Sequence, residues 1–128
     1  MVSSARAAEL ICKAWDKKYN LIPDAIIVEG PESGGHQGFS FQELENIELY
    51  SLESILQKVA KSIKVFEEKH NRRIPLVAAG GIFSAQDISK HLNNGACGVQ
   101  MGSRFVCTHE CEVAIEFKEA YLNAKGFL

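Results

Sequence analysis

The sequence has 128 residues, of which 46% are hydrophobic and 23% charged, with a formal net charge of −2. These values predict a single globular domain rather than a disordered chain. The 14 basic and 16 acidic residues form no basic stripe, which argues against nucleic acid binding. No apolar run approaches the roughly 20 residues that span a bilayer, and the N-terminus does not resemble a signal peptide. The four cysteines lack the dense spacing of a secreted scaffold, so a cytoplasmic location is expected.

Apolar patterns divide the first part of the chain into a helix, a strand and a long loop. Residues 8–15 place apolar side chains at the spacing of an amphipathic helix. Residues 24–29 form an apolar run that predicts a strand buried on both faces. The stretch 30–50 contains four glycines, so we expect an irregular loop, and loops of this length in compact domains are usually functional or disordered.

The middle of the chain predicts a second strand between two helices. Residues 52–66 carry a strong helical stripe, and residues 74–79 form a short apolar run typical of a buried strand. Ser84 and Asp87 predict a capping box at the start of the next helix. Asn94-Gly95 predicts its end.

Two further elements complete the predicted order α-β-α-β-α-β-α. Residues 96–101 predict a third strand and residues 113–121 a last helix. Strands that are joined through helices are parallel, which gives an α/β fold of about three parallel strands with flanking helices. Residues 1–4 resemble the end of another strand. Because three strands leave two open edges, we expect a piece of a larger fold, with self-association through these edges as a possibility to test.

Glycine turns follow the second and third predicted strands. In Ala79-Gly80-Gly81-Ile82 the glycines permit positive φ and close approach of a ligand. The helix that begins at Ser84 is expected to point free N–H groups and its positive dipole end at that ligand. The second turn, Gln100-Met101-Gly102-Ser103, repeats the pattern. One such turn commonly serves packing alone, but two on successive parallel strands predict the phosphate site of a (β/α) barrel.

The loop after the first predicted strand contains a candidate catalytic residue, His36. It is expected on the same face as the two glycine turns, and histidine can act as a general acid or base near neutral pH. The alternative is a surface histidine without a role. The other histidines are weaker candidates, because His70 and His91 are predicted on helix surfaces and His109 in a polar turn.

A second cluster, Cys107 and Cys111 with His109 between them, could in principle ligate a metal ion. Its spacing is not that of the common zinc modules, and no second pair completes four ligands nearby. Packing and helix capping are therefore the preferred interpretation, and no metal is expected.

Three motifs in order resemble the nitronate monooxygenases, formerly called 2-nitropropane dioxygenases, which are relatives of the flavin-dependent enoyl-acyl carrier protein reductases. The motifs are residues 24–36, residues 75–82 and residues 98–105. The resemblance implies an FMN-dependent TIM (β/α)8 barrel, of which residues 1–128 would supply the end of strand five through strand eight as a single partial segment.

The resemblance also implies roles for particular residues. Gly81, with Gln100, Met101, Gly102 and Ser103, would hold the FMN phosphate and its surroundings. Glu29 and Gly34 would lie against the flavin. His36 would act as the acid/base residue toward a carbon next to a nitro group. The complete set of implied cofactor-binding residues is Glu29, Gly34, Gly35, Gly80, Gly81, Gln100, Met101, Gly102 and Ser103.

The activity implied is oxidation of nitronates or nitroalkanes by dioxygen to a carbonyl compound and nitrite. Two alternatives stay open: reduction of an enoyl thioester, and a non-catalytic half-barrel that binds phosphate or FMN and pairs with another copy. Two positions depart from the family pattern, with Ser103 in place of the usual threonine and Glu29 in place of the common glutamine.

Overall fold

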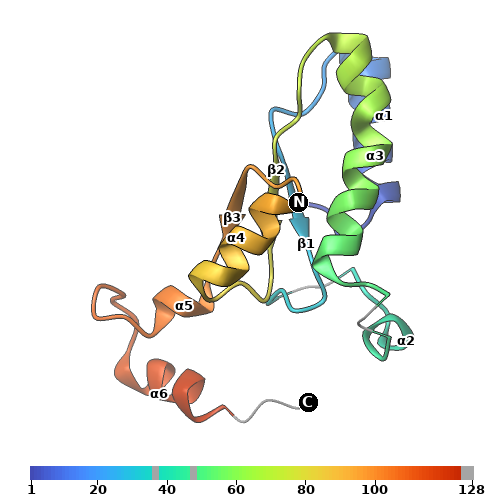
Figure 1. Cartoon of the computed structure of the whole chain (residues 1–128). Helices are drawn as coiled ribbons and strands as arrows, with labels where there is room; N and C mark the ends of the chain where they lie inside the picture. The colour runs from blue at the N-terminus through green and yellow to red at the C-terminus, as the bar shows by residue number, and fades with distance from the viewer. Residues whose placement is uncertain (36–37, 47–48, 125–128) are drawn as a thin grey trace.

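A computed structural model describes residues 1–35, 38–46 and 49–124 (Figure 1). Its elements in chain order are α1 (Ala5–Tyr19), β1 (Ile26–Glu29), α2 (Phe41–Leu44), α3 (Leu52–His70), β2 (Leu76–Ala79), α4 (Ala85–Asn93), β3 (Gly98–Gln100), α5 (Ser103–Val106) and α6 (Ile115–Asn123). The predicted alternation of helices and strands is confirmed. Two short helices were not predicted: α2 lies in the stretch expected to be a loop, and α5 follows the third strand.

The strands form one parallel sheet in the order β1-β2-β3. Their carboxyl ends are level, because Glu29 of β1 pairs with Ala79 of β2, and Ala79 pairs with Gln100 of β3. The loops that follow the three strands therefore leave the sheet along one edge.

The first residues extend this sheet beyond β1. Val2 forms a parallel bridge with Val28, donating its N–H to the Ile27 carbonyl at 2.8 Å and accepting the Glu29 N–H at 2.8 Å. The expectation that this segment resembles the end of a strand is confirmed.

The long helices form a single layer over the sheet. Figure 1 shows α1 and α3 side by side, and Asp16 of α1 joins them by accepting from Lys69 Nζ at 2.7 Å and contacting His70 Nε2 at 2.7 Å. On the other side of α3, Gln57 Nε2 donates to Asn94 Oδ1, at the end of α4, at 3.2 Å. Helices on one face of a parallel sheet are the arrangement of a barrel wall rather than of a doubly wound sheet.

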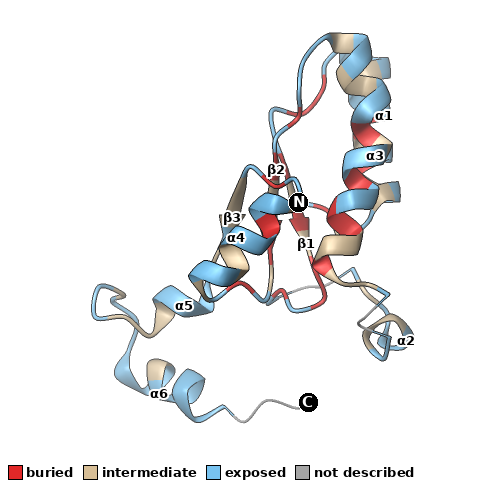
Figure 2. Ribbon diagram, in the orientation of Figure 1, coloured by how far each residue is buried: buried red, intermediate tan, exposed pale blue. Residues whose placement is uncertain are grey.

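The core lies between this helix layer and the sheet (Figure 2). Its largest fully buried side chains are Leu56, Val59 and Ile63 of α3, Cys12 of α1 and Val28 of β1. Burial alternates along β1, since Ile26 and Val28 are buried whereas Ile27 and Glu29 are half-buried. The prediction that this strand is buried on both faces is therefore wrong, because the described helices cover only one face.

The boundaries of α4 match the sequence signals. Ser84 and Asp87 form the predicted capping box, and Gly95 has a φ of +99° immediately after the helix. The C-terminal elements are less covered, and no residue of β3 or α6 is buried. Among the described helices, none combines the length and apolar character required to cross a membrane.

Candidate functional site

A cleft of about 500 Å³ lies at the carboxyl ends of the three strands. It is formed by the loop after β1, the turn after β2 and the turn after β3, as the level strand ends require. Every implied cofactor-binding residue lines it: Glu29, Gly34, Gly35, Gly80, Gly81, Gln100, Met101, Gly102 and Ser103. The sequence prediction that these residues lie together is confirmed, whereas their roles in binding stay predictions.

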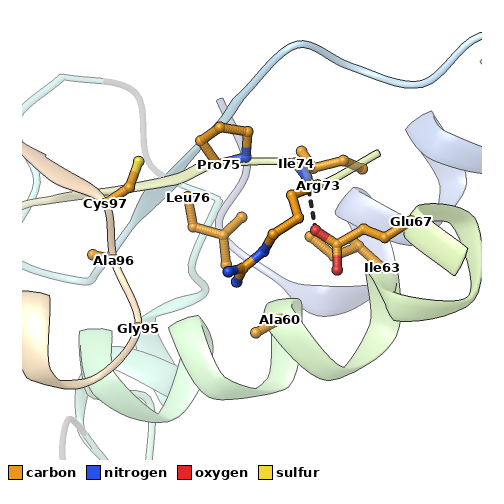
Figure 3. A pocket seen from close by; sticks show the side chains of 10 residues that line it. All are labelled: Ala60, Ile63, Glu67, Arg73, Ile74, Pro75, Leu76, Gly95, Ala96 and Cys97. Carbon is orange, nitrogen blue, oxygen red and sulfur yellow. Dashed lines mark hydrogen bonds between the residues drawn. The ribbon is translucent and has the colours of Figure 1, made fainter. Parts of the chain in front are cut away.

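Another cavity, of about 440 Å³, lies at the opposite end of the sheet (Figure 3). It is bounded by the residues that enter β2 and β3, and Glu67 Oε1 accepts the Ile74 N–H there at 2.7 Å. In barrels the carboxyl ends of the strands carry the active site and the amino ends serve stability. The cleft at the carboxyl ends is therefore the candidate site.

The turn after β2 requires glycine because of its backbone conformation and its close contact with the preceding loop. Gly80 has a φ of +101° and Gly81 a φ of +67°, which other residues rarely adopt. A Cβ on Gly80 would lie 2.6 Å from Ser33 Oγ and 2.8 Å from the Ser33 nitrogen. A Cβ on Gly81 would collide with the Glu32 carboxylate. The loop after β1 thus packs directly on this turn, where Ser33 Oγ also donates to the Ala79 carbonyl at 3.3 Å.

The turn after β3 has a different character. A Cβ on Gly102 would meet no atom within 4 Å, and its φ is −120°, so neither packing nor backbone strain requires glycine there. Gly34, across the cleft, likewise has open space in the direction of a Cβ. The absence of a side chain at these two positions keeps the cleft open.

Backbone amides provide the hydrogen-bond donors of the cleft. Within the residues that the structure describes, the N–H groups of Gly81, Gly102 and Ser103 have no acceptor in the protein. Uncommitted amides at the ends of parallel strands are suited to an anion such as phosphate. Arg104 adds a positive charge at the rim, where its guanidinium carbon lies 4.4 Å from the centroid of the Phe83 ring.

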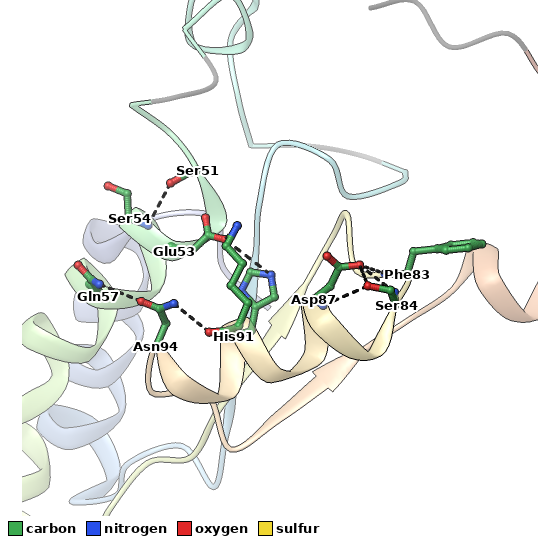
Figure 4. Close-up of polar contacts among 10 residues, drawn as sticks. Ser51, Glu53, Ser54, Gln57, Phe83, Ser84, Asp87, His91 and Asn94 are labelled. Atoms are coloured by element: carbon green, nitrogen blue, oxygen red, sulfur yellow. Dashed lines mark hydrogen bonds and ion pairs between the residues drawn. The ribbon is translucent and has the colours of Figure 1, made fainter.

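The start of α4 differs in part from the sequence expectation. Asp87 Oδ2 accepts the Ser84 N–H at 2.8 Å and the Phe83 N–H at 3.1 Å, and Ser84 Oγ accepts the Asp87 N–H at 3.2 Å (Figure 4). These hydrogen bonds from the Ser84 and Phe83 backbone, together with the Ser84 hydroxyl, lower the pKa of Asp87. The capping box that was also predicted therefore occupies part of this helix start. Within the described residues the N–H groups of Ala85 and Gln86 have no acceptor, so the prediction of free N–H groups holds for these two.

Two carboxylates border the cleft. Glu29 was expected from the resemblance and is half-buried at the end of β1. Glu32 was not expected, and its side chain lies against Gly81. No local sequence signal distinguishes Glu32 from any loop glutamate, because its importance arises from a contact between segments that are about fifty residues apart.

The predicted histidines have different outcomes. His36 falls outside the described residues, so its role stays a prediction. His91 was expected on a helix surface, and this is wrong: it is 5% exposed, because it faces α3. His91 Nε2 lies 3.9 Å from Glu53 Oε1 of α3, and within the described residues its Nδ1 has no hydrogen-bond partner (Figure 4). His70 is partly buried through its contact with Asp16, and His109 is exposed.

A smaller cavity, of about 340 Å³, adjoins the cleft behind the glycine turn after β2, and it is called the second cavity below. Glu32, Gly80 and Gly81 line both spaces, so the turn is the wall between them. On the far side, Lys90 of α4 pairs with Glu53 of α3, with Nζ and Oε1 2.5 Å apart.

The cysteine cluster contributes to packing rather than to the cleft. Cys107 Sγ lies 3.9 Å from the Lys118 carbonyl, and Lys118 Nζ donates to the Thr108 carbonyl at 2.7 Å, which together hold α6 against the segment after α5. Across the described ranges, no three His, Cys, Asp or Glu side chains gather in a way that could hold a metal ion.

The parallel strands, the single helix layer and the cleft of uncommitted amides at the carboxyl ends define this chain as a segment of a (β/α) barrel. A family model described as nitronate monooxygenase matches residues 1–126. The chain belongs to the nitronate monooxygenase family, which is a family of oxidoreductases.

Curated relatives cover the same part of the chain. A (3aS,4S,5R,7aS)-5-hydroxy-7a-methyl-1-oxo-octahydro-1H-indene-4-carboxyl-CoA dehydrogenase of Mycobacterium tuberculosis is 38% identical over 101 residues, which are 79% of this chain and 24% of the relative. A probable nitronate monooxygenase of Staphylococcus aureus is 28% identical over 102 residues, which are 80% of this chain and 26% of the relative.

Two solved structures share the fold. FabK from Thermotoga maritima has a TM-score of 0.69 and 31% identity over 97% of this chain and 32% of its own. Nitroalkane oxidase from Streptomyces ansochromogenes has a TM-score of 0.68 and 30% identity over 93% of this chain and 30% of its own. Both are TIM barrels, so the chain has the fold of part of such a barrel. It spans about a quarter to a third of the length of these relatives.

Proposed function

We propose that this chain is the FMN phosphate-binding segment of a flavin-dependent oxidoreductase of the nitronate monooxygenase type. Members of the matched families are generally flavin-dependent. The observation that carries the proposal is the convergence of Gly81, Gly102 and Ser103, whose amides lack acceptors within the described residues, at one cleft. Residues 1–128 would correspond to the end of strand five through strand eight, which agrees with the four parallel positions from Val2 to β3.

The residues present fit a flavin phosphate. Amides of both glycine turns and the Ser103 hydroxyl supply donors, Arg104 supplies a positive charge at the rim, and Gly34 and Gly102 leave the space open. When bound, FMN supplies the centre that accepts electrons from the substrate and passes them to dioxygen. We assign to His36 the removal of a proton from the carbon that bears the nitro group. We assign turnover to a complete barrel, because these strands provide one part of its wall.

Titration of the chain with FMN, followed by quenching of flavin fluorescence, tests the binding proposal. Gly102→Ala is the sharp variant, because its methyl would project into open cleft space without meeting protein atoms. We expect weaker FMN binding with unchanged stability. Gly98→Ala is the matched control, since it also adds a methyl in open space but lies at the amino end of β3. Absence of quenching at high micromolar FMN, or equal effects of the two variants, would contradict the proposal.

Enoyl-thioester reduction is the alternative reaction. One relative favours a reaction on a thioester, since it is by its name a dehydrogenase of a carboxyl-CoA compound. Full-length relatives that contain this segment would separate the two reactions. Dioxygen consumption with an alkyl nitronate supports the monooxygenase, whereas nicotinamide-dependent reduction of an enoyl thioester supports the reductase.

Pairing of two copies is favoured by one observation. Within the described residues β3 has a strand neighbour on one side only, and open strand edges promote association. Such a pair would be a non-catalytic module that retains the phosphate site. Size-exclusion chromatography with light scattering decides this, since a monomer at all concentrations contradicts the pairing.

A further inference from the structure

Glu32 occupies a position that conflicts with the expected ligand. Its carboxylate lies against Gly81, whose amide is one of the proposed phosphate donors. A phosphate group and a carboxylate at the same turn repel each other, because both are anions within a few ångströms. When a ligand phosphate binds at Gly81, either the Glu32 side chain moves away or the repulsion weakens the binding.

The second cavity gives the Glu32 side chain a place to move. Glu32 lines both the cleft and the cavity of about 340 Å³ behind the glycine turn. Lys90 lines that cavity, and an ammonium group carries three donors, of which the Glu53 contact uses one. Hydrogen bonding to Glu53 raises the pKa of Lys90, and the charge of Glu32 acts in the same direction as the smallest of the causes.

We propose that Glu32 is a specificity-determining gate for phosphate-bearing ligands. Without ligand its carboxylate lies at the Gly81 turn, and a bound phosphate displaces it into the second cavity, where Lys90 receives it. The inference rests on the proposed function, because it presupposes that the ligand phosphate binds at the two glycine turns.

The charges around Glu32 favour this path. Lys90 is the lysine of the second cavity, which His91 also lines, whereas Arg104 stands at the rim of the cleft and can contact the incoming phosphate. The ionisable groups that share the two spaces with Glu32 are Glu29, Glu53, Asp87, Lys90, His91, Arg104 and Tyr121. Because three of these are carboxylates, the neutralisation of Glu32 depends on Lys90 rather than on a general excess of positive charge.

Paired titrations of FMN and riboflavin test the gate, because the two ligands differ only in the phosphate. Glu32→Gln keeps the shape of the side chain and removes its charge. We expect this variant to bind FMN roughly tenfold more tightly, as removal of one like charge at this range predicts, and to bind riboflavin with unchanged affinity. Lys90→Gln should weaken FMN binding in the wild-type background and have no effect in the Glu32→Gln background.

Each outcome has a distinct meaning. Unchanged FMN affinity in Glu32→Gln overturns the gate and leaves the proposed function intact. Equal changes for FMN and riboflavin show that Glu32 supports the loop or the flavin ring, which also overturns the gate. If neither the wild type nor any variant binds FMN, both the gate and the proposed function fail. Circular dichroism of each variant, with Glu45→Gln on the exposed surface after α2 as a matched loss of charge, identifies any effect of unfolding.

Discussion

The two glycine turns look alike in the sequence but differ in the structure. At the first, Gly80 and Gly81 have positive φ and touch the preceding loop, so the protein itself requires glycine. At the second, Gly102 has ordinary φ and no neighbour in the direction of a Cβ, so the protein itself does not require glycine there. The first turn packs against the loop after β1, and the second leaves the cleft open.

Replacement of Gly80 by alanine should have the largest effect. The new Cβ would combine an unfavourable φ with overlap of Ser33, and we expect a loss of roughly 2–4 kcal/mol in the free energy of unfolding. Urea unfolding of the purified chain measures it. Gly95→Ala is the matched control, because Gly95 has a φ of +99° and open space, so it reports backbone strain alone. Equal losses for both variants would refute the view that loop packing demands glycine at the first turn.

Loss of the cap that follows the first turn should have a smaller effect. Ser84→Ala removes the hydroxyl that accepts the Asp87 N–H at the start of α4, and N-cap substitutions of this kind cost about 1 kcal/mol. Ser89→Ala, an exposed serine within the same helix, is the control. The second turn offers a contrast, since Gly102 at the start of α5 provides no side-chain cap. A destabilisation by Ser84→Ala no larger than that by Ser89→Ala would contradict the prediction.

Ser103→Ala should affect binding and leave stability unchanged. Its hydroxyl is exposed in the cleft, and within the described residues it makes no hydrogen bond in the protein. Loss of one hydrogen bond to phosphate should weaken FMN binding by about 0.5–1.5 kcal/mol, which fluorescence titration measures. Ser103→Thr, which keeps the hydroxyl, should retain the affinity. Loss of affinity in both variants would show that the hydroxyl is not the group that matters.

The smallest effect at neutral pH concerns Asp87. Its pKa is lowered by hydrogen bonds from Ser84 and Phe83, so its stabilisation is fully present above the ordinary aspartate pKa of about 3.9 and is lost as the pH falls through the lower folded value. Thermal melts between pH 2 and 7 should show a steeper acid decline for the wild type than for Asp87→Asn. Parallel declines would contradict this assignment.

Sequence reasoning succeeded where the cause was local. The helical stripe of residues 52–66, the capping box of Ser84 and Asp87, and the two glycine turns each depend on spacing within one segment, and the structure contains all of them. The parallel order of the strands followed from their helical connections. These features were sufficient to bring the expected cofactor-binding residues to one edge of the sheet.

It failed where the cause was a contact between distant segments. His91 was predicted on a helix surface, but α3 covers it. Glu32 was not singled out because its importance arises from a glycine turn about fifty residues later. The helix start after the first glycine turn is free only in part, because the capping box occupies the Ser84 and Asp87 N–H groups and leaves those of Ala85 and Gln86.

The single helix layer has a consequence for the opposite face of the sheet. Ile27 of β1 and Val77 of β2 pair in register on this face, and both are apolar and only half-buried. In a (β/α) barrel such positions form layers of side chains inside the closed sheet. Each of these side chains therefore retains apolar surface whose removal from water has not yet contributed to stability. Closure of the barrel would gain that free energy, so the same two residues would link completion of the fold to the rigidity of the strand ends that carry the cleft.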